Sequence, residues 1–414
     1  MDKANQRSPS KKTDSPLTRR QFIAGSGAAL SFTILKPGLV RGTAANSKVE
    51  LGLVGCGQRG TWIADLFMKH GGYQVVAGAD YFQDRVNVFG EKLGVPSVRR
   101  YTGLSCYKKL LEGKVDALAI ESPPYFHPEQ AAAGVEAGVH VFLAKPIAVD
   151  VPGCQSVAES GRKATVKNQC FLVDFQTRTD PLYQEAVART QKGDIGRIVS
   201  GEATYIASIP WARQIEELKP DPMNPELQLR AWGLFRALSG DVITEQNIHA
   251  IDVASWILDG HPNRAYGDGG QKARSYGDCW DYFSVIFTFP NDILVSFCSK
   301  QYGDGWDDIL CRMYGTDGTV DTHYFGDVSI HGKKPYAGGK VDNLYPNGAI
   351  RNIATFHNNI MKGDFSNPTV APSVRSNLTT ILGRMAAYRG AGVTWDEMMT
   401  AGERFEQNLD GLRA

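Results

Sequence analysis

Hydrophobic positions in the first half of the chain form short runs, and amphipathic segments separate these runs. The runs predict buried strands, and the segments between them predict helices. Strands that alternate with helices favour a parallel sheet built from right-handed βαβ units. We therefore expect an α/β domain, with strands over 49–54, 73–79, 115–120 and 140–143 and helices over 62–70 and 128–137.

The pattern changes after about residue 175. Runs in which apolar and polar residues alternate predict half-buried strands, and short turns such as 290–292 join neighbouring runs. This favours an α+β domain with an open, mainly antiparallel sheet. Its predicted elements are strands over 198–206, 282–289, 293–300 and 309–314 and helices over 240–258 and 378–390. The expected domains cover 46–174 and 175–375, and 376–414 is expected to return to the body of the protein as a helical segment.

The first 45 residues have the order of features found in an export signal. Basic residues precede Thr18-Arg19-Arg20-Gln21-Phe22-Ile23, a weakly apolar run extends to Leu35, and small residues follow at 42–46. The apolar run is short for a membrane-spanning helix, which needs about 20 residues. We predict a twin-arginine signal and linker over 1–45, recognised by the twin-arginine export machinery. The protein is then periplasmic or exported, and membrane-tethered if the signal is not cleaved. A basic tail before a partly buried helix is the alternative.

Composition excludes some classes of function. The 414 residues are 42% hydrophobic and carry a net charge of +1, which is ordinary for a soluble two-domain protein and gives no field that attracts nucleic acid. The seven cysteines are odd in number and form no Cys-x-x-Cys pair, so a disulfide framework is not expected. This fits folding in a reducing cytoplasm before export.

A glycine-rich turn follows the first predicted strand and precedes a helix, which is the context of a dinucleotide-binding site. In that interpretation Gly55 permits the tight turn, Gly57 lets a pyrophosphate approach the backbone, and Gly60 lets the helix pack on the strand. An ordinary glycine turn is the alternative. The residues predicted to hold the cofactor here are Gly55, Cys56, Gly57, Gln58, Arg59 and Gly60.

Asp80 ends the second predicted strand, where a carboxylate binds the ribose hydroxyls of NAD and repels the 2′-phosphate of NADP. Asp80 therefore favours NAD as the cofactor. Arg85 weakens this preference, because a nearby cation accommodates NADP; alternatively, Arg85 is a solvated helix residue.

Three polar residues share one face of the predicted helix over 240–258. Glu245, His249 and Asp252 are spaced i, i+4 and i+7. A carboxylate and a histidine at this spacing also suit a metal, but no third histidine has suitable spacing, so we expect none. The other alternative is a structural histidine bonded to Asp252. Lys145 follows a very apolar strand, whose carboxyl end should face the cofactor crevice; the alternative is a surface lysine.

Four stretches of the sequence resemble the Gfo/Idh/MocA family of oxidoreductases. They are Glu121–His127, Gly138–Pro146, Gly193–Ile198 and Gly240–Asp252. The resemblance implies an N-terminal Rossmann domain and a C-terminal open-sheet domain that covers the nicotinamide. It also implies that Ser122, Pro123 and His127 lie near the cofactor, and that Lys145 and His249 lie in the active site. The export signal and the glycine-rich turn together resemble the glucose–fructose oxidoreductases of this family.

Two positions depart from the family pattern. The glutamate that usually precedes Lys-Pro is Ala144 here, and the aspartate that usually lies four residues before the histidine is Glu245. Proton routing is therefore expected to differ from that of the family's sugar dehydrogenases.

Hydride transfer from an alcohol carbon requires removal of the hydroxyl proton. We expect Lys145 to bind the hydroxyl and relay the proton, His249 to act as acid and base, and Glu245 to orient His249 or contact the substrate. Gln176 is a further candidate for cofactor contact. Arg178, Trp211, Arg230, Trp232 and Asp252 are candidates for substrate contact, although connectors and core aromatics have the same pattern. His323 and Tyr324 reach either the site or a subunit interface.

The sequence thus predicts an NAD(P)-dependent oxidoreductase that acts on a sugar or polyol hydroxyl. Free NAD is scarce outside the cytoplasm, so a tightly bound cofactor is expected. One alternative is an NAD-dependent glycosidase that works by transient oxidation and elimination; another is a non-catalytic sugar-binding protein. An open sheet often pairs with a second copy, so a homo-oligomer is expected.

Overall fold

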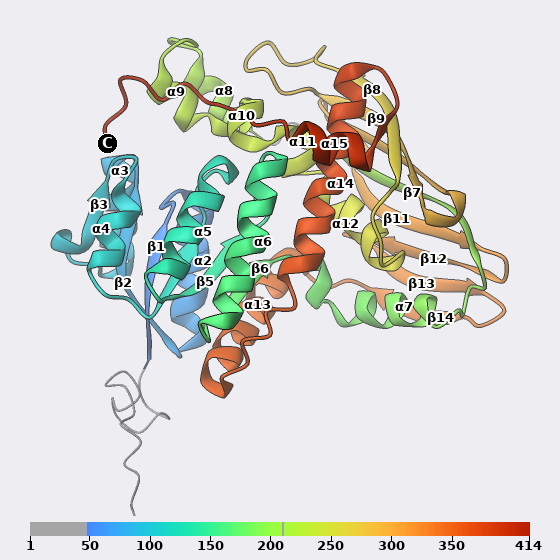
Figure 1. The fold of residues 1–414 in the computed structure, drawn as a ribbon, viewed down its shortest axis with the longest axis horizontal. Coiled ribbons are helices and arrows are strands. Elements are labelled where there is room, and N and C mark those ends of the chain that lie inside the picture. Colours follow the sequence, from blue (N-terminus) through green and yellow to red (C-terminus); the bar gives the residue numbers. More distant parts are fainter. Residues whose placement is uncertain (1–47, 209–210) are drawn as a thin grey trace, which may run out of the picture. The chain divides into compact units, whose positions relative to one another are not determined.

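The computed structural model describes residues 48–208 and 211–414, so the predicted signal over 1–45 lies outside the described residues. Two sheets organise the described part of the chain (Figure 1). None of the helices within these ranges is long and apolar enough to cross a membrane.

The first sheet is entirely parallel and has the strand order β3-β2-β1-β4-β5-β6. The order reverses between β1 and β4, which is where open α/β sheets bind their ligands. The predicted α/β fold of this region is confirmed. The strands are β1 Val49–Val54, β2 Tyr73–Asp80, β3 Arg100–Thr102, β4 Ala117–Ile120, β5 His140–Ala144 and β6 Phe171–Asp174.

Helices cover both faces of this sheet (Figure 1). On one face lie α4 Cys106–Glu112, α5 His127–Glu136 and α6 Val151–Val166, and on the other lie α2 Gln58–His70, α3 Gln83–Leu93 and α13 Leu344–Lys362. The last of these helices comes from the far end of the sequence and packs against α2 and β6.

The second sheet has nine strands in the order β14-β13-β12-β11-β7-β10-β9-β8-β15, and only the β7–β10 pair is parallel within it. This confirms the predicted open, mainly antiparallel sheet. Its strands are β7 Ile198–Ala207, β8 Arg264–Gly270, β9 Tyr282–Phe289, β10 Ile293–Gln301, β11 Asp308–Gly315, β12 Gly318–His323, β13 Asp327–Gly332, β14 Tyr336–Lys340 and β15 Val393–Thr394.

Helices pack on one face of the second sheet, namely α7 Pro181–Gln191, α12 Ile248–Ile257 and α14 Val370–Arg389. The side chains of Tyr266, Ile286, Leu294 and Tyr314 are exposed at alternating strand positions that point away from these helices. The second sheet therefore has one buried face and one open face.

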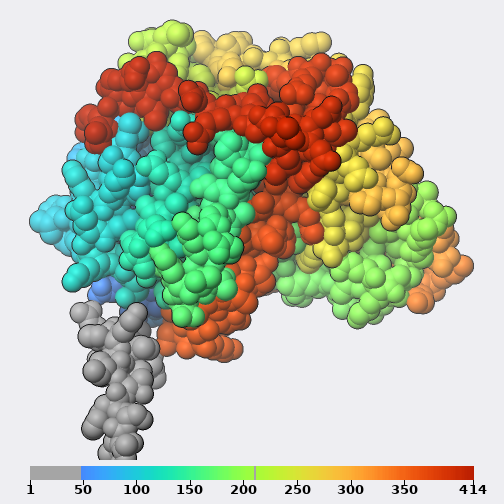
Figure 2. Space-filling view, viewed as in Figure 1, coloured from blue at the N-terminus to red at the C-terminus, as the bar shows by residue number. Residues whose placement is uncertain are grey.

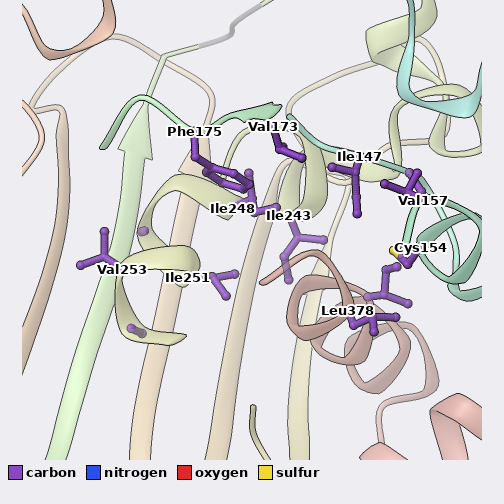
Figure 3. Packing of buried hydrophobic residues seen from close by; sticks show 14 of the residues in the cluster. Ile147, Cys154, Val157, Val173, Phe175, Ile243, Ile248, Ile251, Val253 and Leu378 are labelled. Atoms are coloured by element: carbon purple, nitrogen blue, oxygen red, sulfur yellow. The ribbon is translucent and has the colours of Figure 1, made fainter. Parts of the chain in front are cut away.

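One apolar cluster joins the two sheets (Figure 3). Val173 and Phe175 lie at the end of β6, and they belong to the same cluster as Ile243, Ile248 and Leu378 from the helices of the second sheet. Because a dense core does not deform easily, the carboxyl edge of the first sheet is held in a fixed position relative to α12 and α14.

Two predicted helices differ from those observed. The predicted helix over 240–258 is broken into α11 Asp241–Glu245 and α12, and the helix predicted over 378–390 begins eight residues earlier, at Val370. Three short helices precede the break, α8 Ala212–Leu218, α9 Pro225–Arg230 and α10 Arg236–Ser239, and α15 Trp395–Ala401 follows β15.

Candidate active site

The glycine-rich turn between β1 and α2 leaves room for a ligand at one of its three glycines. Gly55 has φ +94°, and a Cβ atom there would lie 2.4 Å from the backbone nitrogen of Ser122. A Cβ atom on Gly60 would lie 1.8 Å from the carbonyl oxygen of Gly55, whereas one on Gly57 would meet nothing within 4 Å. Gly57 is also the N-cap of α2, and its helix end carries no side-chain cap. The turn therefore fits a pyrophosphate, which binds such free helix N–H groups.

Replacing Gly57 with alanine is expected to weaken NAD binding without destabilising the fold, because the new methyl group enters only the open space at the turn. Loss of one hydrogen bond to a charged phosphate costs about 1.5–3 kcal/mol, or roughly 10–100-fold in Kd. Titration of NADH fluorescence and thermal melting of the variant check both parts. The Gly60→Ala variant is the contrast: its methyl group meets backbone, so it should lose stability as well as binding.

Several predicted cofactor residues line one pocket at the end of β2. Asp80 accepts hydrogen bonds from the N–H groups of Cys56 at 2.8 Å and Phe82 at 2.9 Å, and burial raises the pKa of its carboxyl despite the nearby Arg85 guanidinium. Arg85 lies 4.7 Å from the ring centroid of Phe82. The pocket is lined by Gly55, Asp80, Tyr81, Phe82, Arg85, Gly103, Leu104, Ser122, Pro123, Phe126 and Leu229, among others.

His127 is buried and connects the loops that follow β4 and β5 through hydrogen bonds. Its Nε2 lies 2.7 Å from the carbonyl oxygen of Ser122, and its Nδ1 lies 2.8 Å from that of Pro146. His127 therefore fixes the segments on which Ser122 and Lys145 lie, and both ring nitrogens face protein carbonyls.

Lys145 follows directly on the last residue of β5 and is buried against the break between α11 and α12. Its Nζ donates to the carbonyl oxygen of Glu245 at 2.5 Å and lies 3.2 Å from Glu245 Oε1. In a continuous helix that carbonyl would accept the His249 N–H. Here the His249 N–H donates to the carbonyl of Gln246 instead, at 3.3 Å. The break in the helix thus frees the Glu245 carbonyl for Lys145.

The Glu245 carboxylate is part of a hydrogen-bonded chain. Its Oε2 accepts from Gln246 Nε2 at 2.5 Å, and Gln246 Oε1 accepts from the Tyr205 hydroxyl at 2.7 Å. Glu245 therefore orients Lys145, whereas the sequence predicted that it orients His249 or contacts the substrate.

His249 is buried beside Lys145. Its Nδ1 is enclosed by protein and has no hydrogen-bond partner among the described residues, and its ring packs edge-to-face on Tyr324 at a centroid distance of 5.5 Å. Burial lowers the pKa of His249 well below its usual range, and the Lys145 and Arg59 cations lower it further. The imidazole is therefore neutral at pH 7.

A half-buried arginine spans the ends of three neighbouring strands. Arg59 Nε lies 2.9 Å from Glu121 Oε2 after β4, and its Nη2 lies 2.7 Å from Asp174 Oδ2 at the end of β6. Arg59 also hydrogen-bonds the Tyr345 hydroxyl. Both carboxylate side chains are fully buried, and burial raises the pKa of Glu121 to about 7.

The position between these two carboxylates is Ala144. Ile120 pairs with Leu143, and Ala144 pairs with Asp174, so the side chains of 121, 144 and 174 point to the same face of the sheet. A long side chain at 144 would take the space that the Arg59 guanidinium occupies. The alanine that departs from the family pattern thus lies between two carboxylates that share the Arg59 cation.

Three residues that were predicted to contact the substrate or the cofactor bind other protein groups in the structure, namely Arg178, Asp252 and Gln176. Arg178 pairs with Asp252 at 2.8 Å, and Asp252 also accepts from the Ser376 hydroxyl at 2.6 Å and is fully buried. Gln176 is buried and donates to Asp174 at 2.6 Å. The predictions that Arg178 and Asp252 contact substrate are corrected, because these two side chains pair with each other. Gln176 uses its amide N–H on Asp174 and its Oε1 has no partner among the described residues, so its contact with the cofactor stays a prediction.

Two further predicted substrate residues, Arg230 and Trp232, lie near the pocket at Asp80. Arg230 pairs with Asp84 through two contacts of 3.0 Å and packs 4.0 Å from the ring centroid of Phe82. Trp232 packs in the cluster of Phe82, and Trp211 lies 6.1 Å from Trp232 between ring centroids. The aromatic residues around His249 and the Lys145–Glu245 pair are Tyr205 and Tyr324; only Tyr324 was singled out from the sequence.

Two family models match this chain. Residues 49–172 match the oxidoreductase family model with an NAD-binding Rossmann fold, and residues 183–321 match the GFO/IDH/MocA C-terminal domain. Together they cover β1 to β5 of the first sheet, β7 to β11 of the second sheet and every residue of the Lys145–Glu245–His249 group.

Relatives and solved structures agree with these matches. Myo-inositol 2-dehydrogenase of Thermotoga maritima is 24% identical over 277 residues, covering 66% of this chain and 74% of that protein. A glycosyl hydrolase family 109 protein of Shewanella pealeana is 29% identical over 175 residues, covering 41% of this chain but only 37% of that protein. A levoglucosan dehydrogenase in complex with NADH and levoglucosan has the same fold, with a TM-score of 0.67, 18% identity and coverage of 84% and 99%. The chain therefore belongs to the Gfo/Idh/MocA family and is a nicotinamide-dependent oxidoreductase of that type.

Proposed function

We propose that this protein uses NAD to oxidise a hydroxyl group of a sugar or polyol. The observation that carries the proposal is that the buried Lys145 ammonium and the neutral His249 imidazole lie together beside the carboxyl edge of the first sheet. The similarity to an inositol dehydrogenase and to a levoglucosan dehydrogenase supports the substrate class.

The nicotinamide supplies the hydride acceptor when NAD is bound. Lys145 has an N–H left after its two contacts with Glu245, and this N–H would donate to the substrate hydroxyl. The neutral His249 imidazole would accept the hydroxyl proton as the hydride leaves. Glu245, held by Gln246 and Tyr205, keeps the Lys145 ammonium oriented. A positioned base of this kind contributes roughly 10²–10⁴-fold to the rate.

We propose NAD rather than NADP as the cofactor. The Asp80 carboxylate lines the pocket where a 2′-phosphate would lie. Arg230 pairs with Asp84, whereas Arg85, which also lines the pocket, forms no ion pair among the described residues. NAD is also proposed to be held tightly through turnover.

The full-length protein tests this proposal. Mass spectrometry of nucleotides released from the denatured protein should detect NAD, and a panel of aldoses and polyols should yield NADH from at least one member. A protein that carries no dinucleotide, binds none on titration and reduces none with any member of the panel would refute the proposal and leave a non-catalytic sugar-binding role.

A second candidate is redox-assisted glycoside cleavage, in which a sugar hydroxyl is oxidised transiently and the hydride returns. The 29% identity to a glycosyl hydrolase family 109 protein over 175 residues favours it. Incubation with aryl glycosides separates the two candidates: release of the aryl group without net NADH supports the glycosidase, and net NADH from free aldoses supports the dehydrogenase.

The sequence of the first 45 residues supports export by the twin-arginine route, and we propose a periplasmic or exported location. The exposed apolar side chains on the open face of the second sheet support a homo-oligomer. Cell fractionation tests the location, and light scattering of the purified protein tests the oligomeric state.

A further inference from the structure

The last thirteen residues form an extended segment that runs from α15 to the carboxyl edge of the first sheet. Residues 402–414 follow α15 without forming a further helix or strand. Figure 1 shows the segment passing α10 and α9 and ending beside α3, and Figure 2 shows it as a band over the surface. Contacts with other elements, rather than a helix or strand of its own, fix the course of this segment.

The segment is anchored at both ends. Near its start, the Phe405 N–H donates to Asp150 Oδ2 at 2.9 Å, at the N-terminus of α6. Near its end, the Leu104 N–H donates to the carbonyl oxygen of Arg413 at 3.0 Å, and Arg413 Nη2 donates to the carbonyl oxygen of Tyr81 at 3.1 Å. The Arg413 guanidinium also lies 5.2 Å from the ring centroid of Tyr81.

The short helix α9 also contacts Tyr81 and the start of α3. Glu226 Oε1 accepts from the Tyr81 hydroxyl at 2.6 Å, and Arg230 pairs with Asp84 at the start of α3. Gln407 in the C-terminal segment donates to Gln228 in α9 at 3.2 Å, so the two parts also contact each other. Tyr81 is thus held between α9 and Arg413.

The C-terminal segment and α9 contact residues that line the pocket at the end of β2. Tyr81, Phe82, Gly103 and Leu104 line it from the first sheet, and Leu229 lines it from α9. A Cβ atom on Gly103 would lie 2.2 Å from the carbonyl oxygen of Ala414, so the chain end lies directly against this wall. Leu412 packs in the same cluster as Tyr81, Phe82 and Leu229.

This pocket adjoins Gly55 and Asp80, where the adenosine half of a dinucleotide binds in a sheet of this topology. We propose that residues 402–414 and α9 form a clasp over the adenosine half of bound NAD, and that Arg413 and Tyr81 fasten it. The clasp rests on the proposed use of NAD. It provides the physical means by which the cofactor is retained, since the walls of the pocket separate only when the Arg413 and Tyr81 contacts open.

The test compares cofactor release from the full-length protein and from a variant that stops after Gly402. Each is loaded with NADH, and excess NAD is added while fluorescence follows release. Removal of the segment is expected to raise the release rate at least about tenfold, because the walls of the pocket no longer have to separate before NADH leaves. Circular dichroism checks the fold of both proteins.

Two point variants keep the test decisive if the shortened chain does not fold. Arg413→Met should release NADH several-fold faster, whereas Glu406→Gln, an exposed change in the same segment, should behave like the unmodified protein. Equal release rates for Arg413→Met and the unmodified protein would overturn the clasp while leaving the use of NAD intact. Failure of the unmodified protein to bind NADH would instead overturn the proposed function.

Discussion

Replacing Lys145 with methionine is expected to lower kcat for oxidation of the preferred sugar or polyol by about 10²–10⁴-fold, the range that a positioned acid–base group contributes. Methionine has a similar length but no N–H, so the substrate hydroxyl loses its donor and its route for the proton. Binding of NADH should change little, because the glycine-rich turn and the Asp80 pocket are untouched. Steady-state kinetics and an NADH titration measure the two effects separately.

This variant also leaves the buried Glu245 carboxylate without its cation, since Lys145 Nζ lies 3.2 Å from Glu245 Oε1. The double variant Lys145→Met, Glu245→Gln removes that charge and should recover stability but not activity. Lys163→Met, at an exposed lysine of α6, is the matched control. A kcat within threefold of the unmodified protein in both Lys145 variants would remove this residue from the mechanism.

Replacing Arg59 with methionine is expected to destabilise the fold by about 3–5 kcal/mol, which is the cost of removing one partner from a buried ion pair. Glu121 and Asp174 are fully buried and lie on either side of Ala144, so the variant leaves two carboxylates without their shared cation. Asp174 keeps two neutral donors, Gln176 at 2.6 Å and Asn352 at 2.8 Å, which limit the loss. Thermal and urea unfolding of the apoprotein measure it.

The triple variant Arg59→Met, Glu121→Gln, Asp174→Asn tests whether the loss is electrostatic. All three charges disappear while the side chains keep similar sizes, and most of the lost stability should return. If the triple variant is as unstable as Arg59→Met, Arg59 stabilises the fold through its packing against Trp62 and Tyr345 and not through its charge.

The sequence contained enough information to predict the two kinds of sheet, the glycine-rich turn and the positions of Lys145 and His249. These depend on local patterns: apolar runs, glycine spacing and a residue that follows a strand. The ion pairs of Arg59 with Glu121 and Asp174 could not be predicted from local patterns. Glu121, Ala144 and Asp174 are adjacent only through the register of β4, β5 and β6, and no single stretch of sequence contains that register.

The helix over 240–258 shows a different limit. Its apolar spacing is continuous through Gln246 and Asn247, yet the chain leaves the helix there and Lys145, a hundred residues away in sequence, takes the freed carbonyl of Glu245. The aromatic residues chosen from sequence show the same limit. Trp211 and Trp232 have side chains suited to a sugar, but Trp232 packs in the cluster of Phe82 and Trp211 packs with Leu218 and Leu234, positions that the sequence does not contain.

The transfer of a hydrogen atom from substrate carbon to nicotinamide tests the central claim most directly. Full-length protein is incubated with carbon-deuterated glucose and carbon-deuterated myo-inositol in separate reactions, denatured, and its nucleotide is examined by mass spectrometry. We predict deuterium in the nicotinamide ring with at least one of these probes, or with another member of the sugar and polyol panel, and none with the Lys145→Met variant. A bound dinucleotide that gains no deuterium from any member of the panel would contradict the account.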